Sequence, residues 1–213
     1  MSSFVRTVRT LSRVRVAAPA AAGCALLAGV FCLGSQGVQA ASSPNLQQSV
    51  EAIRQILAKD GQYLRTTTTA RKDYKSLTER KFSVSEADGC KLIVKSDAHV
   101  HTELTEQKRV SDREWSDIYR PDFSLMDPST VTVTDPEPPQ EQWQTKGYMV
   151  RISVEVDKPL MIASSVDPKS NTARDMPGLP TLAVYVTSRE TADRLGKAFA
   201  QLATACRANP AAK

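Results

Sequence analysis

The stretch TSRETADRLGKAFAQLATAC, Thr187–Cys206, decides the fold predicted for this chain. Its apolar residues recur every three or four positions, the spacing that places side chains on one face of an α-helix. Thr187 and Glu190 match the T-x-x-E capping box that begins many helices. We therefore predict an amphipathic C-terminal helix whose apolar stripe faces a sheet. The stripe consists of Ala192, Leu195, Phe199, Leu202 and Cys206.

A second stretch upstream, FSVSEADGCKLIV at 82–94, predicts a β-hairpin. Apolar and polar residues alternate on both sides of Asp88-Gly89, a dipeptide that suits the positive φ angles of a tight turn. Cys90 opens the second strand of this hairpin. A cysteine at the start of a strand can reach a helix that packs across the same sheet, so Cys90 and Cys206 are predicted to lie close together.

The cysteine count agrees with a disulfide between them. The chain has four cysteines, and two of these, Cys24 and Cys32, lie among the first 40 residues. Cys90 and Cys206 remain, and an even pair in an exported, oxidising context predicts a disulfide. A catalytic or metal-binding thiol is the competing interpretation, but the sequence has no Cys-x-x-Cys motif to support it.

The order of the remaining elements predicts the fold class. Strands that follow one another without intervening helices exclude a doubly wound parallel sheet. We predict an α+β fold, a strongly bent antiparallel sheet or barrel of about seven strands with an N-terminal helix and a C-terminal helix packed on it. The strand-like runs are 82–84, 90–94, 100–110, an irregular stretch at 115–125, 131–133, 147–156, 160–162 and 182–186.

Over about residues 80–208 this order of elements resembles the pleckstrin-homology-like fold. The resemblance rests on element order alone, and it implies a bent sheet closed at one end by the C-terminal helix. Phosphoinositide-binding members of that class carry Lys and Arg around the first hairpin loop, where this chain has the acidic turn Glu86-Ala87-Asp88-Gly89. The resemblance therefore implies a fold and no ligand.

Residues 43–60 are predicted to form the N-terminal helix, with Ser43 as its cap. Four apolar side chains share one face of it, which packs either on the domain's own sheet or on another protein. The threonine-rich stretch at 65–75 follows as a solvated connector or a weak edge strand. The four apolar residues are Leu46, Val50, Ile53 and Leu57.

Residues 1–40 have the pattern of a secretory signal peptide. Arginines but no acidic residues precede an apolar run at 16–33, and Val38-x-Ala40 forms a small-x-small cleavage site. We predict cleavage after Ala40, with an uncleaved N-terminal anchor as the alternative, and a periplasmic or extracellular protein with no transmembrane segment after cleavage. The expected parts are the signal at 1–40, the helix and connector at 41–79, the β domain with its closing helix at 80–208, and a tail at 209–213.

Charge and glycine content exclude two classes of function. The formal net charge of +5 falls to +1 once the four signal-peptide arginines are removed, so nucleic-acid binding loses its electrostatic support. Glycine-rich phosphate loops are missing from 41–213, which argues against a nucleotide-dependent enzyme. We expect no cofactor and no nucleic-acid partner.

His99 and His101 are the only histidines of the chain. Two residues apart on a strand, they point the same way, with Glu103 next on that face. Imidazoles and a carboxylate on one face are typical ligands of zinc or copper, so a metal-binding protein is one functional alternative. A solvent-facing polar strand is the other interpretation of the same residues.

Trp143 and Trp115 are candidate partner-binding residues because both stand in polar surroundings. Tryptophan is enriched among the residues that anchor protein interfaces. The prolines at 136, 138 and 139 stiffen the loop before Trp143, which would lower the ordering cost of binding. The alternative is that each ring covers an edge of the sheet.

The sequence shows no catalytic arrangement that we can identify. It has no G-x-S-x-G motif, and neither histidine stands in a recognisable nucleophile context. We therefore expect an exported, non-enzymatic binding or accessory domain of unknown ligand, which meets a protein or another envelope component. The alternatives are a metal-binding protein that uses His99 and His101, and a hydrolase with unidentified residues.

Overall fold

The computed structural model describes residues 44–69 and 73–209. The predicted signal peptide at 1–40 lies outside these residues. Helices α1 (Pro44–Asp60) and α2 (Arg189–Ala208) flank the strands in sequence. The strands are β1 (Gln62–Thr68), β2 (Tyr74–Asp88), β3 (Lys91–Leu104), β4 (Arg109–Arg120), β5 (Met126–Thr134), β6 (Trp143–Lys146), β7 (Tyr148–Val154), β8 (Ile162–Asp167), β9 (Thr172–Asp175) and β10 (Thr181–Val186).

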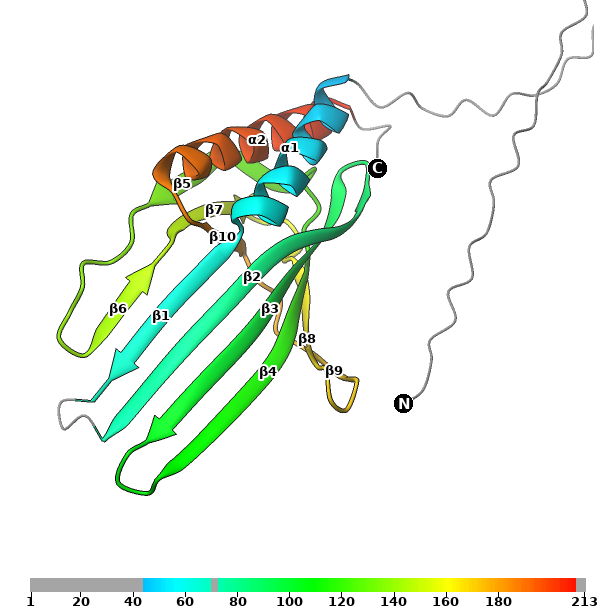
Figure 1. The fold of residues 1–213 in the computed structure, drawn as a ribbon. Coiled ribbons are helices and arrows are strands. Elements are labelled where there is room, and N and C mark those ends of the chain that lie inside the picture. The colour runs from blue at the N-terminus through cyan, green and yellow to red at the C-terminus, as the bar shows by residue number, and fades with distance from the viewer. Residues whose placement is uncertain (1–43, 70–72, 210–213) are drawn as a thin grey trace, which may run out of the picture. The chain divides into compact units, whose positions relative to one another are not determined.

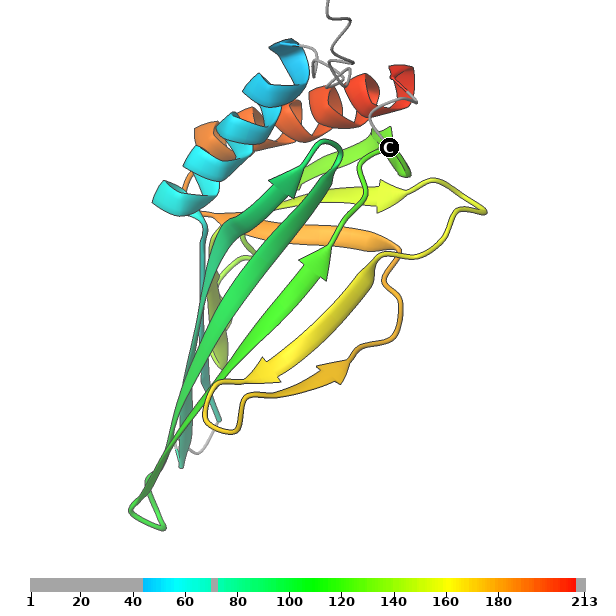
Figure 2. The same cartoon turned by 90° about the vertical axis from the view of Figure 1, so that its right-hand side faces the viewer.

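The strands form two antiparallel sheets. The large sheet has seven strands in the order β6-β1-β2-β3-β4-β8-β9, and the small sheet has three in the order β10-β7-β5. Helices α1 and α2 cover one end of the large sheet, while β2, β3 and β4 run well past them (Figures 1 and 2). The predicted α+β class with two flanking helices is confirmed, and the described strands form open sheets without a closed barrel.

Helix α2 places the predicted stripe in the core. All five of its members, from Ala192 to Cys206, are fully buried. The helix begins one residue later than the capping-box pattern predicts, because Ser188 has an extended backbone and its hydroxyl accepts a hydrogen bond from the Thr191 amide at 3.2 Å. Ser188 is therefore the N-cap, and the predicted pairing of Thr187 with Glu190 is wrong by one position.

Cys90 and Cys206 form the predicted disulfide, with their Cα atoms 5.7 Å apart. Cys90 lies in the turn between β2 and β3, and Cys206 lies in the last turn of α2; both are buried. The ring of Phe199, two helical turns earlier, packs 5.6 Å from that of Phe123. The bond and this ring pair hold α2 across the start of β3.

Helix α1 packs within the same unit as the sheets. Its four predicted apolar residues, Leu46, Val50, Ile53 and Leu57, are all buried in the core. They share one hydrophobic cluster with residues of α2 and with Phe82 of β2. The apolar face of the N-terminal helix is thus occupied by the protein's own core, which is the first of the two interpretations predicted for it.

The strand assignments at 65–75 and 100–110 differ from the prediction. The stretch 65–75 contains most of β1, which lies between β2 and β6 and is therefore not an edge strand. The run predicted as one strand at 100–110 is divided, because a turn at 105–108 separates β3 from β4. Lys108 has the left-handed backbone conformation in this turn, with φ 47°. A glycine at that position would have indicated the turn in the sequence.

Among the described residues, no helix is both long enough and apolar enough to cross a membrane.

Reduction of the disulfide is expected to lower the free energy of unfolding. The bond joins residues 116 positions apart, and the chain-entropy model assigns roughly 4–5 kcal/mol to a loop of about this length. Urea denaturation followed by circular dichroism, with and without dithiothreitol, measures the effect. Reductant should leave a Cys90→Ser/Cys206→Ser variant unchanged, and identical midpoints for the wild-type protein would contradict the prediction.

The substitution Gly61→Ala is expected to destabilise the junction of α1 and β1 by about 1–3 kcal/mol, as overpacking does elsewhere. A Cβ atom there would press against the Leu57 carbonyl oxygen and lie 2.7 Å from that of Phe82. Both contacts are with backbone, which cannot move aside. Gly196→Ala is the control, because the atoms nearest to its Cβ are side-chain methyl groups of Val131 and Val133, at 3.3 and 3.4 Å. Equal melting temperatures for both variants would refute the prediction.

Candidate functional site

Strand register divides the large sheet into two faces. We call the inner face the one that bears Phe82 and Val94, which are buried in the core. Tyr63 of β1 belongs to this face, and its ring lies 4.5 Å from Tyr185 of the small sheet. Because side chains alternate along a strand, the register then assigns every other residue of the large sheet to one face or the other.

The basic residues of the inner face are all arginines, whereas the outer face carries lysines together with Arg120. Arg80 pairs with Ala98, which pairs in turn with Trp115, so these three share the inner face. The same register places Lys75, Lys81 and Lys95 on the outer face, among acidic residues. A guanidinium binds carboxylates and phosphates through two parallel hydrogen bonds, which an ammonium group cannot do. The inner-face arginines are Arg65, Arg80, Arg109, Arg113 and Arg174.

Arg80 is fixed by a buried partner. Its Nη1 donates to Asp117 Oδ2 at 2.9 Å, and the Asp117 side chain is only 7% exposed. Trp115 Nε1 donates to the same oxygen at 3.2 Å, while the Arg80 guanidinium lies 5.6 Å from the centre of the Trp115 ring. The carboxylate therefore holds both side chains in place and balances the charge of Arg80.

Tyrosines surround this cluster. Burial, and then the negative charge of Asp117, raise the pKa of the Tyr119 phenol, which accepts a hydrogen bond from Arg80. Burial also raises the pKa of Tyr185, next to Tyr63. Both phenols stay neutral at physiological pH, so they add no negative charge to the face.

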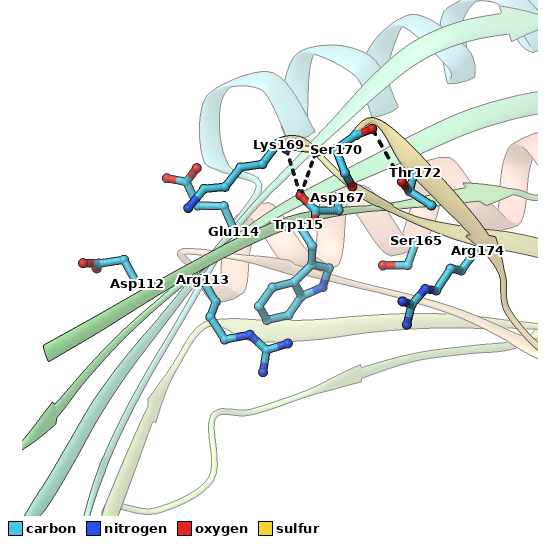
Figure 3. Close-up of a pocket in the computed structure, with 10 residues that line it drawn as sticks. All are labelled: Asp112, Arg113, Glu114, Trp115, Ser165, Asp167, Lys169, Ser170, Thr172 and Arg174. Atoms are coloured by element: carbon cyan, nitrogen blue, oxygen red, sulfur yellow. Dashed lines mark hydrogen bonds between the residues drawn. The ribbon is translucent and has the colours of Figure 1, made fainter. Parts of the chain in front are cut away.

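A cleft of about 630 Å³ opens where β4 and the β8–β9 hairpin separate. Pairing between these elements covers only Ser116–Arg120 of β4, so the strands diverge beyond Ser116. Figure 3 shows Arg113, Trp115 and Arg174 projecting to the same side of the sheet, with Ser165 beside Arg174. Two cationic groups from different elements therefore flank one tryptophan ring and one hydroxyl.

These two cationic groups are free to meet a ligand. Neither Arg113 nor Arg174 has an acidic partner among the ion pairs and hydrogen bonds found in residues 44–69 and 73–209. Both residues are exposed, whereas Arg80 is balanced by Asp117. Asp112, Glu114 and Asp167 also line the cleft, but the first two project from the outer face and Asp167 accepts hydrogen bonds from the amides of the β8–β9 turn. The inner-face side of the cleft can therefore accept one or two carboxylate or phosphate groups, with the Trp115 ring available for stacking.

Trp143, the other predicted interface residue, lies on the same face as Trp115. Trp143 lies on β6, an edge strand of the large sheet, and pairs with Thr67 of β1. The Arg65 guanidinium lies 5.5 Å from the centre of its ring. Three strands separate the two tryptophans. The structure thus gives both rings the same setting, an arginine over an indole, and their role in partner binding stays a prediction.

His99, His101 and Glu103 lie together on the outer face, as the alternation predicts. His101 Nδ1 lies 2.8 Å from Asp112 Oδ1, its Nε2 lies 3.3 Å from Glu103 Oε1, and His99 Nε2 lies 3.2 Å from Asp112 Oδ1. Both ring nitrogens of His101 contact carboxylates, so they are not directed at a common metal position. No group of three or more His, Cys, Asp or Glu within the described part of the chain is arranged to hold a metal ion.

Both histidines therefore contact carboxylates on the outer face, and one of these, Asp112, also lines the rim of the cleft. Neither imidazole in the described structure hydrogen-bonds a serine or cysteine side chain. The metal and hydrolase alternatives gain no supporting geometry from this arrangement.

The sequence prediction missed the inner-face arginines. Arg109, Ser111, Arg113, Trp115 and Asp117 alternate along β4, so a period-two pattern was present. It was obscured because 100–110 was assigned to one strand and 115–125 was taken as irregular. Arg174 gave no signal, since the four residues of β9 are all exposed and lie within a proline-containing loop.

No protein-family model matches the chain, and no curated protein or solved structure matches it either.

His101 is expected to titrate above its ordinary value of 6.5. Hydrogen bonds, to Asp112 and then to Glu103, raise the pKa of His101, and the same bond lowers the pKa of Asp112. The pair therefore stabilises the fold between the lowered Asp112 pKa and the raised His101 pKa. Its contribution is lost as pH rises through the pKa of His101 or falls through that of Asp112.

NMR titration of the His101 ring protons tests this prediction. Asp112→Asn should move the His101 midpoint down toward 6.5, since it removes the stronger of the two carboxylate partners. A wild-type midpoint at or below 6.5, or one unaffected by Asp112→Asn, would show that the outer-face pair does not form in solution.

Proposed function

We propose that this protein is an exported, non-enzymatic binding or accessory module that holds an acidic segment of a partner protein on its inner face. The observation that carries the proposal is the cleft in which Arg113 and Arg174, both without an acidic partner, flank Trp115. Tryptophan and arginine are among the residues most enriched in the small groups that dominate protein interfaces.

The electrostatics favour a short acidic segment over a long polyanion. The mature chain is nearly neutral, and acidic residues such as Glu79, Asp97 and Asp112 occupy the outer face. The positive field is therefore confined to one face of one sheet, which suits a few carboxylates better than an extended phosphate backbone.

The disulfide supports the exported setting of this proposal. Buried disulfides form and persist in oxidising compartments and are rare in the cytosol of mesophiles. The Cys90–Cys206 bond ties α2 to the β2–β3 turn of the large sheet, the sheet that bears the inner face.

A charge-reversal pair tests the proposed function. A fluorescein-labelled octaglutamate peptide serves as the probe, and its binding is followed by fluorescence anisotropy. Arg113→Glu/Arg174→Glu is expected to weaken binding at least about tenfold, because charge-assisted hydrogen bonds contribute more than 1.4 kcal/mol each. Binding should also weaken as salt is raised.

The matched control is Lys75→Glu/Lys81→Glu, which changes the net charge by the same amount on the outer face. It should leave binding within about twofold of wild type, since the altered charges lie across the sheet from the probe. If both double variants weaken binding equally, the effect comes from the net charge of the protein and not from the inner face. If an oligothymidylate of equal length binds more tightly than octaglutamate, the site favours nucleic acid, which contradicts the proposal.

A further inference from the structure

The half of β4 that lies farthest from the helices is an open strand edge. β4 pairs with β3 from Arg109 to Tyr119, but β8 covers its other side only from Ser116 onward. Residues 109–115 thus have a strand partner on one side only, and this part of β4 forms the margin of the sheet in Figure 1. Such an edge presents unpaired backbone N–H and C=O groups to which another strand can add.

The space for an added strand ends at the cleft. The β8–β9 turn, between Asp167 and Thr172, lies beside β4 at the point where their pairing stops. A strand laid along 109–114 would extend the line of β8 and meet this turn. Its end would then lie beside Arg113, Arg174 and Lys169, three of the residues that line the cleft.

The side chains of β4 define what such a strand must carry. Arg109 and Arg113 project from the inner face, while Val110, Asp112 and Glu114 project from the outer face. Side chains of neighbouring strands that share a face lie in contact, and opposite charges there stabilise the pair. An added strand therefore needs carboxylates at every second position, with apolar, hydroxyl or basic residues between them.

A second copy of this chain does not meet this requirement. Two β4 edges paired about Ser111 would place Arg109 opposite Arg113 twice, and pairing about Asp112 would place that carboxylate opposite itself. Like charges directly opposite each other destabilise a strand pair. These two registers therefore disfavour pairing of the edge with its own sequence, and the exposed arginines favour a different, acidic chain.

We propose that the edge of β4 from Arg109 to Glu114 accepts an extended segment of a partner protein as an additional strand, with Asp or Glu at alternate positions contacting Arg109 and Arg113. This inference rests on the proposed function and specifies how the acidic segment is held. Backbone hydrogen bonds provide the pairing, and the arginines select the segment.

Peptides with and without the alternating pattern test the inference. The probe is the labelled peptide TEVETEVT, and its control is TEEEVTVT, which has the same composition with the glutamates adjacent. The alternating peptide is expected to bind the full protein at least about fivefold more tightly, because only it can place all its carboxylates on one face. Amide hydrogen exchange should show new protection within residues 109–114 when it binds.

Two N-methylated forms of TEVETEVT, one methylated at odd and one at even residues, separate strand pairing from simple charge attraction. A strand added to an edge uses the N–H groups of one side only. One form should therefore lose binding while the other retains it. An equal effect of both forms, whether loss or retention, overturns strand addition.

Single substitutions in the protein complete the test. Arg109→Glu should weaken binding of TEVETEVT about tenfold, whereas Lys108→Glu, in the adjoining turn, should change it less than twofold. If the two peptides bind equally and only Arg113→Glu/Arg174→Glu weakens them, strand addition fails and the proposed function stands. If neither peptide nor octaglutamate binds, both fail.

Discussion

The disulfide between Cys90 and Cys206 ties the C-terminal helix, which packs on the small sheet, to the large sheet. It joins the β2–β3 turn to the last turn of α2, and the buried residues around it form one cluster with α1 and the small sheet. Because a covalent bond and a continuous apolar cluster act at the same end, both helices are confined to that end. The opposite half of the sheet is left without a covering layer (Figure 2).

This asymmetry explains how one strand can serve both core and surface. The inner-face residues of β4 change from half-buried Tyr119 and buried Asp117, through half-buried Trp115, to exposed Arg113 and Arg109. Each step of two residues moves the side chain farther from the helices. A continuous strand thus passes from the core to the exposed surface, and the pair between half-buried Arg80 and buried Asp117 lies at the transition.

Sequence patterns predicted the elements with strong local signals. The apolar stripe of α2, the face of α1 and the turn at Gly89 were all found, because helical periodicity and Asp-Gly turns are local properties. The boundary between β3 and β4 was missed, since the turn there contains neither glycine nor proline and polar residues continue on both sides of it. The N-cap was displaced by one residue because only Thr187 has a glutamate three positions later, whereas the actual cap, Ser188, is followed there by Thr191.

The sequence by itself determined the fold class, the cysteine pair and the shared face of the two histidines, because each depends on the order of elements or on spacing along a single element. The tertiary structure alone decided that Arg113 and Arg174 flank one cleft and that half of β4 lacks a second strand partner. These features depend on which strands become neighbours and where their pairing stops. That choice is made by pairing between β4 and β8, from Arg120↔Ile162 to Ser116↔Val166, which are 42 to 50 residues apart along the chain, and no local pattern encodes it.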